Sequence, residues 1–426
     1  MNFKYLYDNR TLSVEVDDRN VAGVLSPVSM PAADPCRLIA EALARPAGSP
    51  RLGDFLSGAK TPLCIVNDAS RPSPVPAVLE AAPEIAGHPA MRFLVATGTH
   101  PAPDEAGLAA IFGPRMNEVR GRILIHDCRK DDELAAVGRT PAGTEVRINR
   151  AVAESDRLVV IGAVEPHYFA GFTGGRKSFL PGCAAFSTVE QNHRLALNPG
   201  SAVLALEGNP VHEDMEAAAA LIPADRVFSI QAVFDGEDRI CAAEAGGLGE
   251  SFRRAVRTAE AVYGVPTAGL APAGIVVAVV SPPLDADLYQ AHKALENAKA
   301  ALRPGGVFIL VASCRNGLGN DAFVRLLASE TEPGAVVEKV RSEYRLGHHK
   351  SVKIAEFAGH SRLWAVTRLD PGVLESIFIR PFGDLQAALD AAFRGEPEAR
   401  ALFVRSAGTV VPVLRNADPG GRRAYN

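Results

Sequence analysis

Short apolar segments alternate with alanine-rich segments along most of this chain, and that alternation limits the folds open to it. Buried parallel strands read as short continuous apolar runs, whereas the helices that connect them carry apolar residues at helical spacing. We therefore predict an α/β protein. The predicted strands cover residues 62–66, 93–96, 123–126, 158–161 and 227–233, and the predicted helices include 74–82 and 187–196.

The chain of 426 residues is long enough for two domains that each bury a core. Proline and glycine concentrate at 265–274, so we predict two α/β domains over 1–264 and 274–426. A β-hairpin is expected at the start, and the polar tail from residue 416 is expected to fray or to return to the first domain. The second domain should open with strand 275–280, helix 287–302, turn 303–306 and strand 307–312.

Composition excludes several classes of protein. The formal net charge is only −4, so bulk charge does not attract nucleic acid or anionic lipid. The longest aliphatic run, 275–280, is too short to span a bilayer, and the first residues do not resemble a signal peptide. Six scattered cysteines without CxxC spacing argue against a disulfide framework or a zinc knuckle. We expect a cytoplasmic protein that binds neither nucleic acid nor membrane.

Unusual residues gather in the loops that follow the predicted strands. One loop carries Asp68, Ser70 and Arg71 before a proline-initiated helix, and the next carries Gly98-Thr-His100. Ligands of open parallel sheets bind outside the carboxyl ends of the strands, so these loops should share one crevice. Free N–H groups at the helix start, with Ser70 and Arg71, suit a phosphate or a carboxylate. An alternative for Asp68–Pro74 is a helix cap with a surface arginine.

The loop after strand 158–161 is the richest in reactive residues. Its segment Gly171-Phe-Thr-Gly174-Gly175-Arg176-Lys177-Ser resembles a Walker A loop, but arginine stands where the last glycine is required, and Pro181-Gly182 follows instead of a helix. One alternative is a phosphate-binding ATPase or kinase; another is a glycine turn with a solvated Arg176–Lys177 pair. We favour a loop that holds Lys177 rigidly toward a ligand.

Three histidines and one short helix complete the candidate site. His100 and His167 occupy comparable strand-end positions, and an imidazole can titrate near neutral pH, which favours a general acid/base pair. His193 is a candidate metal ligand that spacing alone supports weakly. His126-Asp127-Cys128 is a further candidate cluster, although adjacent residues splay apart on a strand. In the second domain, Gln290 and Lys293 share one side of a helix after Tyr289 and suit a carboxylate.

In combination these motifs resemble the nickel-dependent lactate racemase family. The resemblance extends through both predicted domains and keeps the order and approximate spacing of the motifs. It rests on Asp68-x-Ser-Arg-Pro-x-Pro, Gly98-Thr-His100, Pro166-His167-x-x-Ala-Gly-x-x-Gly-Gly-x-Lys177, Pro181-Gly182, Asn192-His193 and Tyr289-Gln290-x-x-Lys293.

The resemblance implies a nickel-pincer nucleotide, in which nickel is held by a pyridinium-3-thioamide-5-thiocarboxylate mononucleotide. By this similarity Lys177 holds the cofactor covalently, and His193 is the nickel ligand of the protein. His100 and His167 form the acid/base pair on opposite faces of the substrate. Further cofactor contacts are assigned to Asp68, Ser70, Arg71, Gly174 and Gly175, and substrate contacts to Arg71, Tyr289, Gln290 and Lys293.

The implied reaction inverts C2 of a 2-hydroxy acid by reversible hydride transfer through a 2-keto acid. Domain 1–264 then binds the cofactor and carries the catalytic residues, and domain 274–426 closes over a cleft between the two. The expected partners are a small 2-hydroxy acid and the enzymes that make the cofactor. Besides the ATPase or kinase, a binding protein that keeps the pocket without turnover remains an alternative, and the matched residues do not identify the acid.

Overall fold

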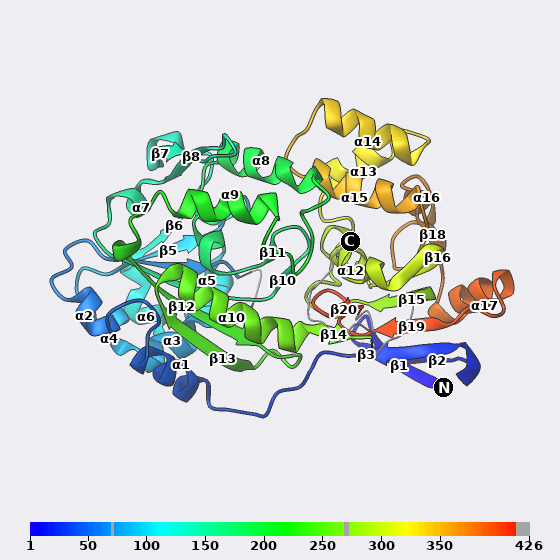
Figure 1. Ribbon diagram of the computed structural model, residues 1–426, viewed down its shortest axis with the longest axis horizontal. Helices are drawn as coiled ribbons and strands as arrows, with labels where there is room; N and C mark the ends of the chain where they lie inside the picture. Colours follow the sequence, from blue (N-terminus) through cyan, green and yellow to red (C-terminus); the bar gives the residue numbers. More distant parts are fainter. Residues whose placement is uncertain (70–71, 268–271, 415–426) are drawn as a thin grey trace. The chain divides into compact units, whose positions relative to one another are not determined.

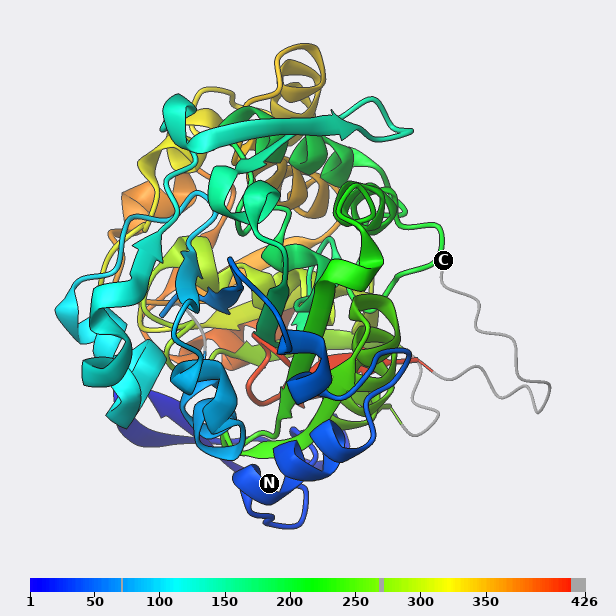
Figure 2. The same cartoon turned by 90° about the vertical axis from the view of Figure 1, so that its left-hand side faces the viewer.

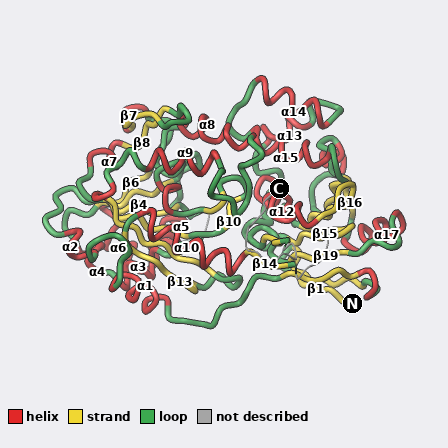
Figure 3. The backbone as a smooth tube through the Cα atoms, viewed as in Figure 1, coloured by secondary structure: helices red, strands yellow, loops and turns green. Residues whose placement is uncertain are grey.

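The computed structural model describes residues 1–69, 72–267 and 272–414 (Figure 1). The chain divides into two compact units. Residues 29–262 form the central unit, and residues 1–28 together with 263–426 form the flanking unit. Strands and helices alternate along the chain, as the α/β prediction requires (Figure 3).

The central unit is built on a six-stranded sheet in the order β13-β12-β9-β4-β5-β6. All neighbours pair in parallel except β13, which runs antiparallel to β12. The predicted strands are confirmed as β4 (Leu63–Asn67), β5 (Arg92–Ala96), β6 (Ile123–Ile125), β9 (Leu158–Ala163) and β12 (Val227–Phe234), to which β13 (Ile240–Gly246) is added. The strand order reverses at β4, because the chain passes from β4 to β5 on one side and later places β9 on the other.

Helices and two small ladders surround this sheet. The helices are α1 (Pro35–Ala44), α2 (Leu52–Leu56), α3 (Val75–Ala81), α4 (Pro83–Gly87), α5 (Glu105–Phe112), α6 (Met116–Val119), α7 (Arg150–Glu154), α8 (Phe186–Arg194), α9 (Pro210–Ala219) and α10 (Leu248–Tyr263). The ladders are β7 (Leu134–Arg139) with β8 (Glu145–Asn149), and β10 (Pro166–His167) with β11 (Gly171–Phe172).

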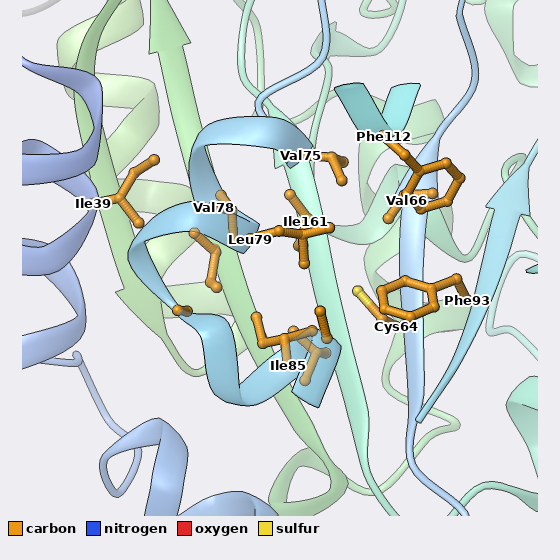
Figure 4. Packing of buried hydrophobic residues seen from close by; sticks show 14 of the residues in the cluster. Ile39, Cys64, Val66, Val75, Val78, Leu79, Ile85, Phe93, Phe112 and Ile161 are labelled. Carbon is orange, nitrogen blue, oxygen red and sulfur yellow. The ribbon is translucent and has the colours of Figure 1, made fainter. Parts of the chain in front are cut away.

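The core of the central unit lies between one face of the sheet and α1, α3 and α4 (Figure 4). Cys64 and Val66 of β4 and Ile161 of β9 point to this face, as strand alternation requires. Phe93 meets Phe112 edge to face with ring centroids 5.7 Å apart. The packed core holds fixed the strands whose ends carry the candidate residues.

The flanking unit contains a second six-stranded sheet, in the order β18-β17-β16-β15-β19-β3, with every neighbouring pair parallel. Its strands are β3 (Val21–Leu25), β15 (Ala273–Val279), β16 (Leu302–Val311), β17 (Arg362–Val366), β18 (Arg380–Phe382) and β19 (Ala401–Val404). The smaller pairs are the predicted hairpin β1 (Asn2–Tyr7) with β2 (Arg10–Glu15), and β14 (Gly264–Pro266) with β20 (Val411–Val413). The helices are α11 (Leu288–Ala291), α12 (Lys293–Ala298), α13 (Asp321–Leu327), α14 (Pro333–Ser342), α15 (His348–Ala358), α16 (Pro371–Glu375) and α17 (Leu385–Gly395).

The first 28 residues belong to a different unit from the one that the predicted domain 1–264 implies. β3 pairs in parallel with β19, and Phe3 of the hairpin packs against Phe403 with ring centroids 4.4 Å apart. These partners lie far away in the sequence, so local patterns do not reveal them. The two compact units divide between residues 262 and 263, and the domain boundary at 265–274 stays a prediction.

The predicted helix 287–302 is interrupted after Ala291, and residues 302–306 are extended as the start of β16 instead of forming a separate turn. The Tyr289 carbonyl, which a continuous helix would bond to the Lys293 amide, accepts from Lys350 Nζ at 2.7 Å and lies 3.0 Å from His292 Nδ1. These side chains replace the helical bond, so the helix restarts as α12. Among the described residues, no helix is long and apolar enough to cross a membrane.

Candidate functional site

His100 forms a short hydrogen bond with Asp68, two candidates that the sequence analysis did not pair. β4 and β5 are neighbours, so the loops at their carboxyl ends are adjacent. His100 Nδ1 lies 2.6 Å from Asp68 Oδ2; the Asp68 side chain is 14% exposed and that of His100 53%. An ionised carboxylate only accepts, so Nδ1 carries the proton, and Nε2 of the neutral ring keeps its lone pair. Ser70 and Arg71 lie outside the described residues.

His167 has the opposite arrangement of ring protons. It ends β10 and is buried, and its Nδ1 accepts the Ala170 backbone N–H at 3.3 Å. In the neutral ring the proton is therefore on Nε2, which makes this nitrogen a donor. With these hydrogen bonds, Nε2 of His100 can accept a proton and Nε2 of His167 can donate one.

Phe169 is the common neighbour of three predicted site residues. Its ring centroid lies 4.6 Å from that of His167, 5.0 Å from that of His193 and 5.9 Å from Lys177 Nζ. The structure therefore brings the acid candidate His167, the metal-ligand candidate His193 and the candidate attachment residue Lys177 around one aromatic ring. The sequence analysis missed Phe169, although its position between His167 and Lys177 was a usable signal.

His193 lies near the end of α8, and its Nδ1 is 3.2 Å from Asn192 Oδ1. Within the described residues, no group of three or more His, Cys, Asp or Glu side chains is arranged to hold a metal ion. A metal at His193 would therefore need most of its ligands from a group other than the described side chains. Imidazole nitrogen is a suitable ligand for nickel.

Backbone bonds tie the two candidate loops together. The Gly98 N–H, two residues before His100, donates to the Gly182 carbonyl at 2.9 Å. At the other end of the Lys177 loop, the Thr173 hydroxyl donates to the Ala163 carbonyl at 2.8 Å. The position of His100 is therefore linked to the fold of the loop that carries Lys177.

The two glycines before Arg176 are required by packing within the protein. Gly174 and Gly175 have φ angles of +80° and +52°, which favour glycine. A Cβ on Gly174 would lie 2.6 Å from Gln231 Oε1, and one on Gly175 would lie 2.9 Å from the Phe252 ring. Their assignment to cofactor binding stays a prediction, because these contacts already account for both glycines.

The local structure does not supply the parts of a Walker A site. The segment Gly175–Ser178 is a short 3₁₀ helix, and the next α-helix in the described chain begins at Phe186. A Walker A lysine is followed directly by an α-helix whose N-terminus faces the phosphates. The geometry therefore disfavours the ATPase or kinase alternative.

Arg176 is buried, so the alternative of a solvated Arg176–Lys177 pair is wrong. The guanidinium is 2% exposed, donates to the Ala170 carbonyl at 2.8 Å and to the Gly174 carbonyl at 3.3 Å, and lies 4.3 Å from the Phe252 ring centroid. Burial lowers the pKa of Arg176 to about 9, which leaves the side chain charged at neutral pH. The Arg176 guanidinium therefore stabilises the turn between His167 and Lys177 by binding its backbone carbonyls.

In the cluster His126-Asp127-Cys128, the His126 ring is bound to neighbouring segments of the protein and Cys128 is buried. His126 Nε2 lies 3.0 Å from the Ala184 carbonyl, and its Nδ1 lies 3.3 Å from Asn149 Nδ2. Burial lowers the pKa of His126, and Cys128 is buried as well. The imidazole therefore fastens the strand-end loop to the segment before α8.

Of the predicted substrate residues in the flanking unit, Tyr289 and Gln290 lie on α11 and Lys293 begins α12. The Asp287 carboxylate accepts the Gln290 N–H at 2.8 Å and so caps the helix. Lys350 Nζ lies 3.0 Å from the Tyr289 ring centroid, and burial followed by repulsion from Lys293 lowers the pKa of Lys350. Gln290 and Lys293 are half-buried. Their contact with substrate, and the cleft between the domains, stay predictions.

Comparison with known proteins gives one consistent result. The model of a family described as the lactate racemase N-terminal domain matches residues 7–204, and that of the lactate racemase C-terminal domain matches residues 270–411. The lactate racemase of Thermoanaerobacterium thermosaccharolyticum is 32% identical over 357 residues, which cover 81% of this chain and 82% of the relative. The lactate racemase of Lactiplantibacillus plantarum is 29% identical and covers 93% of this chain and 96% of the relative.

Solved structures agree with the sequence comparison. The lactate racemase apoprotein from T. thermosaccharolyticum superposes with a TM-score of 0.87 at 28% identity, covering 98% of this chain and all of that one. A protein from Thermotoga maritima shares the fold with a TM-score of 0.69 at 15% identity, covering 89% of this chain and 98% of the other.

Replacing the buried cation should loosen the Lys177 loop. We expect Arg176→Met to lower the free energy of unfolding by about 3 kcal/mol, because several buried carbonyls lose their donor. Urea titration measures this loss, and hydrogen exchange should rise across residues 170–178. Arg157→Met is the matched control, because its guanidinium lies 5.5 Å from the Phe55 ring centroid and donates to two carbonyls elsewhere. Unchanged exchange in Arg176→Met would contradict the role assigned to this arginine.

Proposed function

The chain belongs to the lactate racemase family and is an isomerase, and from this premise we propose that it inverts C2 of a 2-hydroxy acid with a nickel-pincer nucleotide attached to Lys177. The names of its relatives make lactate the first candidate substrate. The observation that carries the proposal is the contrast between the Nδ1 partners of the two histidines, a carboxylate for His100 and a backbone N–H for His167, because inversion through a ketone needs one group that takes a proton and another that returns it.

The chemistry explains why two histidines are needed. The C2 hydrogen of a 2-hydroxy acid is too weakly acidic for an imidazole to remove as a proton. The bound cofactor would supply the acceptor that takes this hydrogen as hydride and gives it back. His100 Nε2 would take the hydroxyl proton, which yields a planar 2-keto acid, and His167 Nε2 would donate a proton to the carbonyl oxygen when hydride is returned to the other face of C2. The opposite enantiomer uses the same groups in exchanged roles.

Asp68 positions the His100 ring for this step. As His100 Nε2 takes the proton the ring becomes an imidazolium, and the carboxylate at 2.6 Å stabilises its charge. The partial exposure of His100 lets the proton pass to solvent between turnovers. Asp68 thus acts through His100, in addition to any contact with the cofactor.

The side chains present fit the proposed cofactor. When bound, the nickel-pincer nucleotide supplies the hydride acceptor, a role that ordinary side chains do not fill. Lys177 is half-buried beside Phe169 and offers an amine for covalent attachment. His193 offers one imidazole, which suits a metal that arrives with its other ligands already in place. Asn192 at His193 Nδ1 leaves Nε2 as the nitrogen that would meet the metal.

Recognition of the carboxylate is assigned to cations and an amide. Lys293 and Gln290 of the flanking unit carry this role in the proposal, together with Arg71 of the central unit. A carboxylate is common to every 2-hydroxy acid, so these residues set the substrate class, and the side chain on C2 is recognised by others.

Substitution of the acid/base residues should abolish racemisation without unfolding the protein. Protein produced with the cofactor's biosynthetic enzymes would be assayed on L-lactate and other enantiopure 2-hydroxy acids by chiral chromatography. We expect His100→Gln and Asp68→Asn each to lower kcat/KM by about 10²-fold or more, because the base is lost or its tautomer is no longer held. Exposed His360 provides the control His360→Gln, which should retain activity.

A lack of turnover by the nickel-loaded wild-type protein on every acid tested would favour the silent binding protein instead. Circular dichroism on each variant separates loss of chemistry from loss of fold.

Solvent isotope incorporation tests the hydride route. In deuterated water, an unlabelled substrate that loses and regains hydride keeps its original hydrogen at C2. We therefore expect little deuterium at C2 of the inverted product, measured by mass spectrometry after partial conversion. Removal of C2–H as a proton would instead exchange it with solvent, so substantial deuterium at C2 would exclude the proposed route.

A further inference from the structure

A buried carboxylate outside the residues already discussed is linked to His193 through Asn192. Asp214 lies on α9 and is 2% exposed. Thr140 Oγ1 donates to its Oδ1, and its Oδ2 accepts from Thr144 Oγ1 at 2.9 Å and from Asn192 Nδ2 at 2.8 Å. A carboxylate so deeply buried is stabilised only when donors surround it, and here the turn between β7 and β8 and helix α8 supply three of them.

The carboxylate fixes the orientation of the Asn192 amide. The nitrogen of that amide donates to Asp214 Oδ2 at 2.8 Å and lies 3.3 Å from the Val211 carbonyl, and both partners are acceptors. A flipped amide would place its oxygen against two oxygens, which is unfavourable in a fully buried side chain. The Asn192 oxygen is therefore directed to the one remaining partner, His193 Nδ1 at 3.2 Å.

An amide oxygen only accepts, so His193 Nδ1 must donate. The neutral ring then carries its proton on Nδ1 and presents an unprotonated Nε2. We propose that Asp214 and Asn192 are positioning residues that hold His193 in the tautomer whose Nε2 binds the metal. This inference rests on the proposed function, in which His193 is the nickel ligand.

The network extends to a turn that otherwise looks peripheral. Thr140 and Thr144 flank the turn between β7 and β8, and both are buried. The Thr144 N–H donates to Thr140 Oγ1 at 3.2 Å, so the Thr140 hydroxyl proton remains available for Asp214. The hairpin runs beside α8, and α8 packs against α9 (Figure 2). Asp214 thus connects the hairpin, α9 and the metal-ligand candidate on α8.

A purely structural role for Asp214 makes a different prediction. If the carboxylate only fastens the hairpin to the helices, its loss would lower stability and leave the proton of the His193 ring where it was. The position of that proton therefore separates the two roles. The chain also offers a matched control, because Thr188 of α8 donates to the Glu145 carbonyl at 2.7 Å and so fastens the same helix to β8 without contacting Asp214.

The experiment is a ¹⁵N nuclear magnetic resonance measurement on cofactor-free full-length protein labelled at histidine, at pH about 8.5, where an ordinary imidazole is neutral. His193→Gln identifies the signals of the His193 ring. We expect the wild type to show a protonated Nδ1 and a bare Nε2. Asn192→Leu should shift the ring toward the Nε2–H form, whereas Thr188→Val should leave it unchanged. A wild-type ring protonated on Nε2, or no change in Asn192→Leu, would overturn the inference.

A second readout uses nickel. After loading with the nickel-pincer nucleotide and dialysis, Asn192→Leu and Asp214→Ala should retain the metal about 10- to 100-fold less tightly than wild type and Thr188→Val. The wild-type tautomer decides the inference even if a variant fails to fold. The predicted tautomer with no nickel bound in any preparation would reject the proposed function and leave the hydrogen-bond network standing. Nickel bound by a protein whose His193 ring has the opposite tautomer would support the proposed function and reject the inference about Asp214 and Asn192.

Discussion

The pairing of β4 between β5 and β9 is the constraint on which the rest of the central unit depends. Because all three strands are parallel, their carboxyl ends lie at one edge of the sheet, and the strand order reverses at β4. The loops after β4 and β5 deliver Asp68 and His100, and the loop after β9 delivers His167 and Lys177. Residues distant in the sequence therefore share one sheet edge before any side chain makes a contact.

Hydrogen bonds then give each histidine its own chemical character. In the proposed function, a carboxylate at Nδ1 makes His100 a base at Nε2 and a backbone N–H makes His167 a donor at Nε2. An amide oxygen at Nδ1 would leave Nε2 of His193 for the metal. One residue type thus fills three roles, and the partner of the ring selects the role. The buried Arg176 supports this arrangement, because it closes the turn on which His167 and Lys177 lie.

Much of the fold could be predicted from the sequence, since buried strands and proline- or glycine-rich boundaries leave local signals. The partners of side chains could not. Asp68 and His100 are 32 residues apart, and Asn192 and Asp214 are 22 apart, so only the folded structure shows that the members of each pair meet. A solvated Arg176 was one alternative from the sequence, because an arginine is rarely buried without a carboxylate partner; here backbone carbonyls and the Phe252 ring take that place. The break in helix 287–302 was hidden for the same reason, because Lys350 lies 61 residues from Tyr289.

The central claim is that the loop between β9 and α8 attaches a cofactor through Lys177 and completes its metal site with His193. Intact-mass and metal analysis of the protein isolated from its native host, followed by peptide mapping, tests this most directly. The account predicts a covalent mass increment on Lys177 and nickel close to stoichiometric with the chain. An unmodified Lys177 in protein that racemises a 2-hydroxy acid, or an increment on a different residue, would contradict it.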